Sequence, residues 1–183
     1  HMRLHHSFEP DYLWDPDESA CRQAIILDPQ SKVMDSASDA ISKADLVYLA
    51  CPPAVREPYA LAAAAAGKAL FLEKPFGINL DDSARLMALL QAYNVPVAVN
   101  FTQASGAALT DLLAAKERGE MGDLHGVDII VTYPAWPRQW QKGADWLRFR
   151  AEGGMTREVI SHFLFFTERI LGPLSLITAH TTY

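Results

Sequence analysis

The chain has 183 residues, of which 50% are hydrophobic and 21% are charged, and its formal net charge is −6. This composition is that of a globular protein and excludes wholesale disorder. The acidic balance argues against a basic surface for nucleic acid or anionic lipid, so neither is an expected partner. No apolar stretch reaches the roughly 18 residues of a membrane span and no signal peptide is recognisable, which predicts a soluble, cytoplasmic protein. Two cysteines, Cys21 and Cys51, are too few for a disulfide framework or a metal cage, and no metal site is expected.

The first half of the chain alternates short apolar runs with longer amphipathic ones. This alternation, with short connections, predicts an α/β fold with a parallel sheet covered on both faces. Acidic residues at the start of two of the amphipathic runs and Gly67 at the end of another are typical helix boundaries. Strands are expected at 11–14, 45–50, 69–72 and 95–101, and helices at 17–26, 38–43, 55–66 and 80–93.

The pattern changes after residue 100, where we place a domain boundary. A first domain is expected at 3–100 and a second at 101–183, each of them partial. The second should contain an open mixed sheet, and its lone apolar strand at the end needs more chain or a partner to cover its edge. Helices are expected at 107–118 and 156–171, and strands at 126–133 and 174–183.

A parallel sheet with an acid after an early strand suggests a dinucleotide-binding fold, with Asp15 as the candidate acid. The glycine-rich phosphate loop of such folds lies roughly 20 residues before that acid. Only 14 residues precede Asp15 here, and the first glycine of the chain is Gly67. Either the chain is an internal piece of a longer protein, or it does not bind a dinucleotide in the usual way.

The tripeptide Glu73-Lys74-Pro75 follows the carboxyl end of a predicted strand, where open α/β sheets bind ligands. A lysine at that place can donate a hydrogen bond and a positive charge to a substrate hydroxyl or a developing alkoxide. The alternative is a solvated Glu-Lys pair, which the tripeptide alone favours.

A second candidate for chemistry is Glu158 with His162, four residues apart on a predicted helix that follows Gly153-Gly154. A carboxylate on the same helix face orients an imidazole and suits it to proton transfer near neutral pH. The two glycines would let a substrate or cofactor approach the start of the helix. The alternative is an ordinary, half-exposed helical pair.

The segment before these glycines is rich in aromatic and basic residues. Such side chains can stack on a sugar ring and pair with a carboxylate. They fit equally well an interface between domains or subunits. The residues are Trp136, Trp140 and Trp146 with Arg138, Arg148 and Arg150, of which Trp140, Trp146 and Arg148 are the predicted substrate contacts.

The order of these features resembles the Gfo/Idh/MocA family of nicotinamide-dependent oxidoreductases. The resemblance implies a Rossmann domain, here without its first strand, followed by an α/β domain whose open sheet often forms a dimer. It implies NAD, or NADP, as cofactor and a sugar or polyol as substrate, and it predicts a homo-oligomer. It rests on the runs Ala44-Asp-Leu-Val-Tyr-Leu-Ala-Cys-Pro-Pro53, Gly67-Lys-Ala-Leu-Phe-Leu-Glu-Lys-Pro-Phe76, Val97-Ala-Val-Asn-Phe101 and Gly119-Glu-Met-Gly-Asp-Leu124, and on the Gly-Gly…His helix.

By position, Lys74 matches the family's lysine that contacts the reacting oxygen, and His162 matches its general acid/base, with Glu158 beside it. Several family positions differ. Glu158 stands for an aspartate, Cys51 for a threonine and Arg56 for a histidine; Ile160 stands for a glycine, Phe165 for an acid, and Thr102-Gln103 stand where an arginine is usual. Asp15 matches the acid near the adenosine ribose and favours NAD over NADP. The predicted cofactor-binding residues are Asp15, Ala50, Cys51, Pro52, Pro53, Glu73, Lys74 and Asn100.

These features predict an oxidoreductase that transfers a hydride between a nicotinamide cofactor and a CH–OH group of a sugar, polyol or related molecule. The alternatives are a sensor of the same fold that binds a nucleotide or sugar without turnover, and a fragment that binds no cofactor.

Overall fold

A three-stranded sheet forms the centre of the first part of the chain in the computed structural model, which describes residues 2–141 and 143–182. The strands β3 (Leu46–Leu49), β4 (Ala69–Glu73) and β5 (Val97–Asn100) lie in the order β3-β4-β5. β3 and β4 are parallel and in register from Leu46 opposite Ala69 to Leu49 opposite Leu72. The predicted α/β fold with a Rossmann-like parallel sheet is confirmed.

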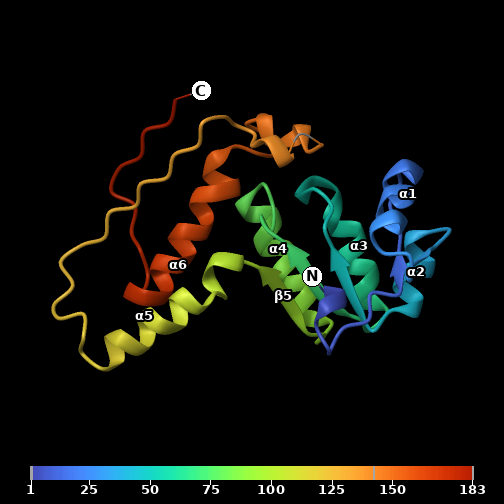
Figure 1. The fold of residues 1–183 in the computed structure, drawn as a ribbon, viewed down its shortest axis with the longest axis horizontal. Coiled ribbons are helices and arrows are strands. Elements are labelled where there is room, and N and C mark those ends of the chain that lie inside the picture. Colours follow the sequence, from blue (N-terminus) through green and yellow to red (C-terminus); the bar gives the residue numbers. More distant parts are fainter. Residues whose placement is uncertain (1, 142, 183) are drawn as a thin grey trace. The chain divides into compact units, whose positions relative to one another are not determined.

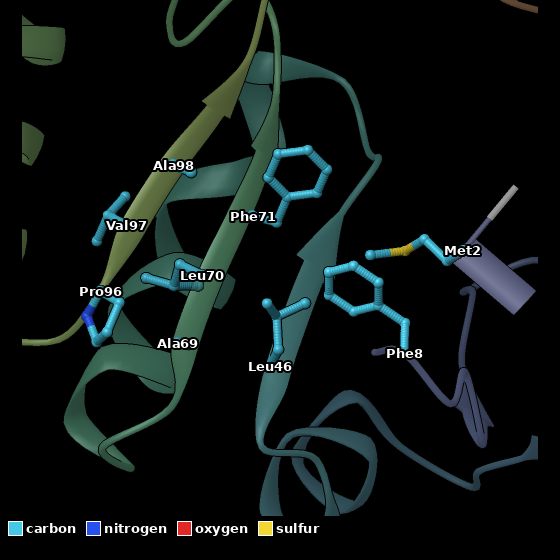
Figure 2. Close-up of a pocket in the computed structure, with 9 residues that line it drawn as sticks. All are labelled: Met2, Phe8, Leu46, Ala69, Leu70, Phe71, Pro96, Val97 and Ala98. Atoms are coloured by element: carbon cyan, nitrogen blue, oxygen red, sulfur yellow. The ribbon is translucent and has the colours of Figure 1, made fainter. Parts of the chain in front are cut away.

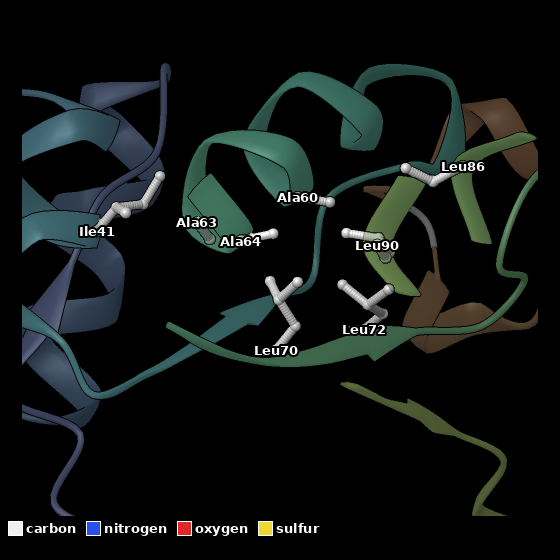
Figure 3. Packing of buried hydrophobic residues seen from close by; sticks show 8 residues of the cluster. All are labelled: Ile41, Ala60, Ala63, Ala64, Leu70, Leu72, Leu86 and Leu90. Atoms are coloured by element: carbon white, nitrogen blue, oxygen red, sulfur yellow. The ribbon is translucent and has the colours of Figure 1, made fainter. Parts of the chain in front are cut away.

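Helices α3 (Pro53–Ala65) and α4 (Leu80–Ala92) connect these strands and cover one face of the sheet (Figure 3). Leu70 and Leu72 alternate with half-buried neighbours along β4 and point into this core. Small residues on α3 let the helix lie close to the strand, because alanine adds almost no bulk. The buried cluster consists of Ile41, Ala60, Ala63, Ala64, Leu70, Leu72, Leu86 and Leu90.

α3 begins two residues before the predicted start, at Pro53. Proline is favoured in the first turn of a helix, since its missing N–H has no partner to lose there. The Pro52-Pro53 pair therefore both ends the strand and starts the helix. α4 begins after Asn79, whose side chain accepts hydrogen bonds from the amides of Asp81 and Asp82.

A separate two-stranded parallel sheet precedes this core. It pairs β1 (Tyr12–Leu13) with β2 (Lys32–Val33), a two-residue strand that hydrophobic periodicity did not predict. A short 3₁₀ turn (Met2–Leu4) begins the described chain. In sequence, α1 (Glu18–Leu27) lies between the two strands and α2 (Ala37–Lys43) follows the second. Asp17 and Ser36 cap these helices through their side chains.

An apolar hollow of about 330 Å³ lies against the three-stranded sheet, beside the N-terminal segment (Figure 2). Phe8 and Met2 come from that segment, and Leu46, Phe71 and Val97 come from the three strands. None of its nine lining residues is charged. The hollow therefore offers no acid, base or nucleophile.

The chain divides into two compact units, His1–Val99 and Asn100–Tyr183. The second contains α5 (Ala107–Glu117) and α6 (Ser161–Leu171), which pack together (Figure 1). The Lys116 ammonium donates to the Ile170 carbonyl near the end of α6. One π-helical turn (Thr156–Ile160) precedes α6, and 3₁₀ turns occupy Thr102–Ala104, Gln139–Gln141 and Asp145–Arg148.

The two strands expected in the second unit are not formed. Residues 126–133 and 174–182 are irregular, and Tyr183, the last residue of the second prediction, lies outside the described residues. Valine and isoleucine favour a pleated surface, but a strand also needs a hydrogen-bonded neighbour. Ile130 and Ile177 are accordingly 87% and 97% exposed. The second unit thus has no mixed sheet in its described part.

No helix in the described part of the chain is both long enough and apolar enough to cross a membrane.

Candidate functional site

Two loops meet at one buried side chain in the first unit. The first loop, Ala50–Pro52, leaves β3, and the second, Lys74–Phe76, leaves β4. Arg56 lies on the first turn of α3 and is 1% exposed. Both loops stand at the carboxyl ends of parallel strands, which is the edge where α/β sheets bind ligands.

The Arg56 guanidinium donates to backbone carbonyls in both loops. Nη2 donates to Cys51 O at 2.7 Å, and Nη1 donates to Pro75 O at 2.5 Å and to Glu73 O. Burial lowers the pKa of Arg56, while Cys51 and Glu73 partly offset that effect. An arginine keeps its charge throughout the ordinary pH range, so these carbonyls face a permanent cation.

Glu73 and Lys74 occupy the end of β4 and the residue after it. The Glu73 carboxylate accepts a hydrogen bond from the Tyr48 hydroxyl on β3. Lys74 is half-buried, and the following Pro75 is buried and joined to it by a cis peptide. The structure thus places the predicted Lys74 in the same loop pair as Cys51, Pro52 and Glu73.

The remaining predicted cofactor residues lie near the ends of other strands or at the start of α3. Asp15 follows β1 and is exposed, and its carboxylate accepts a hydrogen bond from the Asp17 amide at 2.8 Å. Asn100 ends β5 and is half-buried, whereas Pro53 begins α3 and is buried. The predicted preference for NAD through Asp15 stays a prediction.

His162 lies in the first turn of α6 in the second unit and is 8% exposed. Its ring meets the edge of Phe101, with 5.7 Å between the ring centroids. Phe101 also stacks on Phe165 at 4.6 Å, so His162 lies in an aromatic setting. Since Lys74 belongs to the other unit, the convergence of these two side chains stays a prediction.

Glu158 belongs to the π-helical turn and not to a regular α-helix as predicted. Its carboxylate accepts a hydrogen bond from Gln141 Nε2 at 3.1 Å and lies 3.9 Å from Arg138 Nη2. Arg138 Nε in turn donates to Gln141 Oε1 at 2.9 Å. Arg138, Gln141 and Glu158 therefore form a polar chain in which Gln141 and Glu158 are buried.

Arg138 also organises the aromatic segment. Its guanidinium carbon lies 4.6 Å from the ring centroid of Trp140, 5.0 Å from that of Tyr133 and 5.8 Å from that of Trp136. These distances are within the range of cation–π attraction. Trp140 is 75% exposed, so its ring contacts the Arg138 cation and is also accessible to solvent.

The other two predicted substrate residues lie on the 3₁₀ turn Asp145–Arg148. Trp146 is half-buried, and the exposed Arg148 lies 3.7 Å from Asp145. Gly153, expected to admit a ligand, lies instead against backbone: a Cβ there would meet Leu147 Cα at 2.5 Å. The space beside this glycine is filled by the protein itself.

Two residues with central contacts were not predicted as part of a site. Arg56 was noted only as a departure from a histidine, and Gln141 carried no signal, because nothing in its sequence surroundings pairs it with a residue 17 positions later. The departure at Arg56 was a usable signal: an arginine in an apolar helical run needs several acceptors when it is buried.

Residues 1–101 match a family described as "Oxidoreductase family, NAD-binding Rossmann fold" (GFO_IDH_MocA). This match covers more than half of the chain. The chain belongs to the Gfo/Idh/MocA family. The resemblance inferred from the ordered motifs is confirmed.

Individual members of the Gfo/Idh/MocA family show the same relationship. A dTDP-3,4-didehydro-2,6-dideoxy-α-D-glucose 3-reductase from Streptomyces violaceoruber is 30% identical over 130 residues, which is 70% of this chain and 36% of that protein. An inositol 2-dehydrogenase from Gluconacetobacter diazotrophicus is 31% identical over 110 residues, 58% of this chain and 33% of that protein. The chain thus spans about a third of the length of these curated relatives.

The fold agrees with solved structures as well. A probable dehydrogenase from Thermotoga maritima superposes with a TM-score of 0.76 at 21% identity, over 93% of this chain and 50% of that one. At this identity the likeness establishes the shared fold.

Proposed function

We propose that this protein transfers a hydride between a nicotinamide cofactor, NAD in preference to NADP, and a CH–OH group of a sugar, polyol or related small molecule. The observation that carries the proposal is the family match over residues 1–101. A relative named for reduction of a dTDP-sugar and another named for oxidation of inositol support the substrate class. The activity belongs to the whole protein, of which this chain spans a part.

Lys74 and His162 are the proposed catalytic residues. When bound, the nicotinamide supplies the hydride acceptor. As the substrate C–H bond breaks, the hydroxyl proton passes to His162 at Nε2, since Nδ1 is buried. The Lys74 ammonium stabilises the oxygen on which negative charge develops. Glu158, through its contacts with Gln141 and Arg138, anchors the turn that precedes His162 and stays the proposed partner of the imidazole.

The loops after β3 and β4 fit the nicotinamide side of the cofactor. Their backbone carbonyls accept hydrogen bonds from Arg56, and Lys74 is the first residue of the second loop. They do not supply a pyrophosphate cradle, because the chain's first glycine is Gly67. The proposed cofactor contacts within this chain are therefore Ala50, Cys51, Pro52, Pro53, Glu73, Lys74 and Asn100, with Asp15 near the ribose.

The aromatic segment of the second unit is the proposed substrate platform. Trp140 offers an exposed ring for a sugar face, and Trp146 and Arg148 lie on the following turn. The Arg138 guanidinium, 4.6 Å from the centroid of the Trp140 ring, favours a ring orientation that faces this cation.

The proposal is tested by hydride transfer in the full-length protein that contains this chain. Myo-inositol and a panel of sugars and sugar nucleotides are offered with NAD and with NADP, and the absorbance of reduced nicotinamide is followed. We expect turnover with at least one polyol or sugar. Lys74→Met and His162→Asn should each lower kcat by about 10²–10⁴-fold, because each removes a group that acts in the transition state.

The matched control is Lys68→Met, which removes a lysine that contacts the Ser42 carbonyl at the opposite end of β4. It should leave kcat unchanged. Undiminished turnover in both catalytic variants would contradict the assigned roles. Binding of NAD by calorimetry without turnover of any substrate in the panel would contradict the enzymatic proposal and favour a sensor.

A further inference from the structure

Arg56 is a cation that is almost completely buried in the first unit, with 1% of its surface exposed. It is among the largest fully buried side chains, together with Leu70 and Leu72. Burying a guanidinium is costly unless its donors are satisfied. The cost indicates that its contacts carry a role that a leucine or methionine of similar volume would not fill.

In the described part of the chain, every hydrogen-bond acceptor of Arg56 is a backbone carbonyl of the two loops or of the last residue of β4. The Cys51 carbonyl lies in the loop after β3, and those of Glu73 and Pro75 lie at the end of β4 and in the loop after it, 17 and 19 residues along the chain. The guanidinium therefore links two segments that no ladder hydrogen bond joins beyond the pair Leu49–Leu72.

The planar fork of arginine suits this arrangement. Its two terminal nitrogens point to different loops, whereas Nε is buried and makes no hydrogen bond with the described residues. A lysine has a single terminal nitrogen and can serve one loop or the other, but does not hold both in a fixed plane.

We propose that Arg56 is a positioning residue that sets the distance and orientation between the loop Ala50–Pro52 and the loop bearing Lys74. Its hydrogen bonds to Glu73 and Pro75 bracket Lys74 on both sides, so they restrict the backbone from which the ammonium projects. The expected effect of Arg56 on the reaction rate rests on the proposed function, but its effect on the position of Lys74 does not.

The placement is tested without cofactor or substrate. Lysine amines are dimethylated with ¹³C-formaldehyde, and the Lys74 signal is assigned by its loss in Lys74→Arg. We expect Arg56→Met and the milder Arg56→Lys to shift or broaden the Lys74 methyl signal and to leave that of Lys68 in place. Arg85→Met is the matched control, because it removes an exposed arginine that pairs with Glu57 on the same helix as Arg56.

The kinetic arm uses a double-mutant cycle. Arg56→Lys should lower kcat on the order of 10²-fold with little change in KM, since a displacement of about 1 Å has that effect on a reacting group. In the Lys74→Met background the same substitution should lower kcat no further, because Arg56 acts through Lys74. A purely structural role would instead lower the activity of both backgrounds alike.

An unmoved Lys74 signal in a folded Arg56 variant overturns the proposal. Loss of the thermal unfolding transition in both Arg56→Met and Arg56→Lys also overturns it, because Arg56 would then serve the stability of the whole unit. A displaced Lys74 signal in a protein that shows no hydride transfer supports the positioning role and contradicts the proposed function, so the two failures are distinguishable.

Discussion

Two arginines of this chain, Arg56 and Arg85, have different roles. Among the described residues, Arg56 is buried and donates to backbone carbonyls alone. Arg85 is exposed and forms a two-pronged pair with Glu57, with both N–O distances at 2.8 Å. The exposed pair joins α4 to α3 across the outer surface. Exposed pairs contribute little to stability because solvent screens them, whereas a buried guanidinium strongly constrains the groups around it.

The Glu57–Arg85 pair predicts a small pH dependence of stability. The hydrogen bond from Arg85 holds the pKa of Glu57 below its ordinary value of 4.5. A lowered pKa in the folded state contributes stability that is fully present above pH 4.5 and is lost as the pH falls through the lowered value. Glu57→Gln should therefore lower the melting temperature at pH 7 and have no effect near pH 2.

This difference is measured by thermal unfolding of both proteins across the pH range. Glu9→Gln, which neutralises another exposed carboxylate, serves as the control and should change the melting temperature less at pH 7. An effect of Glu57→Gln that persists unchanged at pH 2 would be inconsistent with the ion pair as its source.

The π-helical turn before α6 is the clearest departure from regular structure among the elements. Glu158 lies in this turn, and its carboxylate reaches back to Gln141 at 3.1 Å. Gly154, two residues before the turn begins, adopts a φ of 90°, a conformation that favours glycine. π turns are frequent at functional sites, and this one presents both Glu158 and the start of the His162 helix.

The close packing around Gly153 predicts that a larger side chain at this position destabilises the second unit. A Cβ at this position would lie 2.5 Å from Trp146 O and from Leu147 Cα, both of them backbone atoms that cannot rotate away. Gly153→Ala should lower the free energy of unfolding by about 1–3 kcal/mol through overpacking. The measurement is denaturant unfolding followed by tryptophan fluorescence, since Trp136, Trp140 and Trp146 all report on the second unit.

Gly126→Ala is the control for this prediction, because a Cβ at Gly126 meets no atom within 4 Å. We expect it to change the free energy of unfolding by less than about 0.5 kcal/mol. Equal stability of the two variants would show that the turn at 146–147 moves freely away from Gly153.

The whole molecule is a pair of compact units that differ in how completely they bury their apolar residues. The first unit encloses a leucine and alanine core between its sheet and two helices. The second leaves the expected strands unpaired, with Ile130 and Ile177 open to solvent. Unpaired apolar segments of this kind favour pairing with further chain or with another copy.

We therefore expect the protein to self-associate, as a dimer or a larger homo-oligomer. Ile130→Asp and Ile177→Asp should weaken association, because each places a charge on the apolar segments. Ile26→Asp is the control, since Ile26 is 77% exposed but lies on α1 in the first unit. The oligomeric state is measured by sedimentation velocity over a range of protein concentrations. A monomer at every concentration would refute the expected self-association.

The local features of the fold were predictable to within a few residues. The apolar runs at β3 and β4 and the first residues of α1, α2 and α4 lie close to where the sequence placed them, because hydrophobic periodicity and helix-start signals depend on neighbours only a few positions away. The two-residue strand β2 was not predicted, since Lys32 and Val33 are too few to show any period. The predicted strands at 126–133 and 174–183 were wrong for the described residues, because pairing depends on a second strand.

The sequence by itself determined the α/β class, the family and the location of Lys74 at the end of a strand, because each depends on local pattern or on the order of motifs. Only the tertiary structure decided that Arg56 joins the loops of Cys51 and Pro75, that Gln141 holds Glu158, and that Gly153 accommodates backbone and not a ligand. These contacts join residues up to 19 positions apart, and the hydrogen-bond partner of a buried polar group is set by the packing that surrounds it and not by its neighbours along the chain.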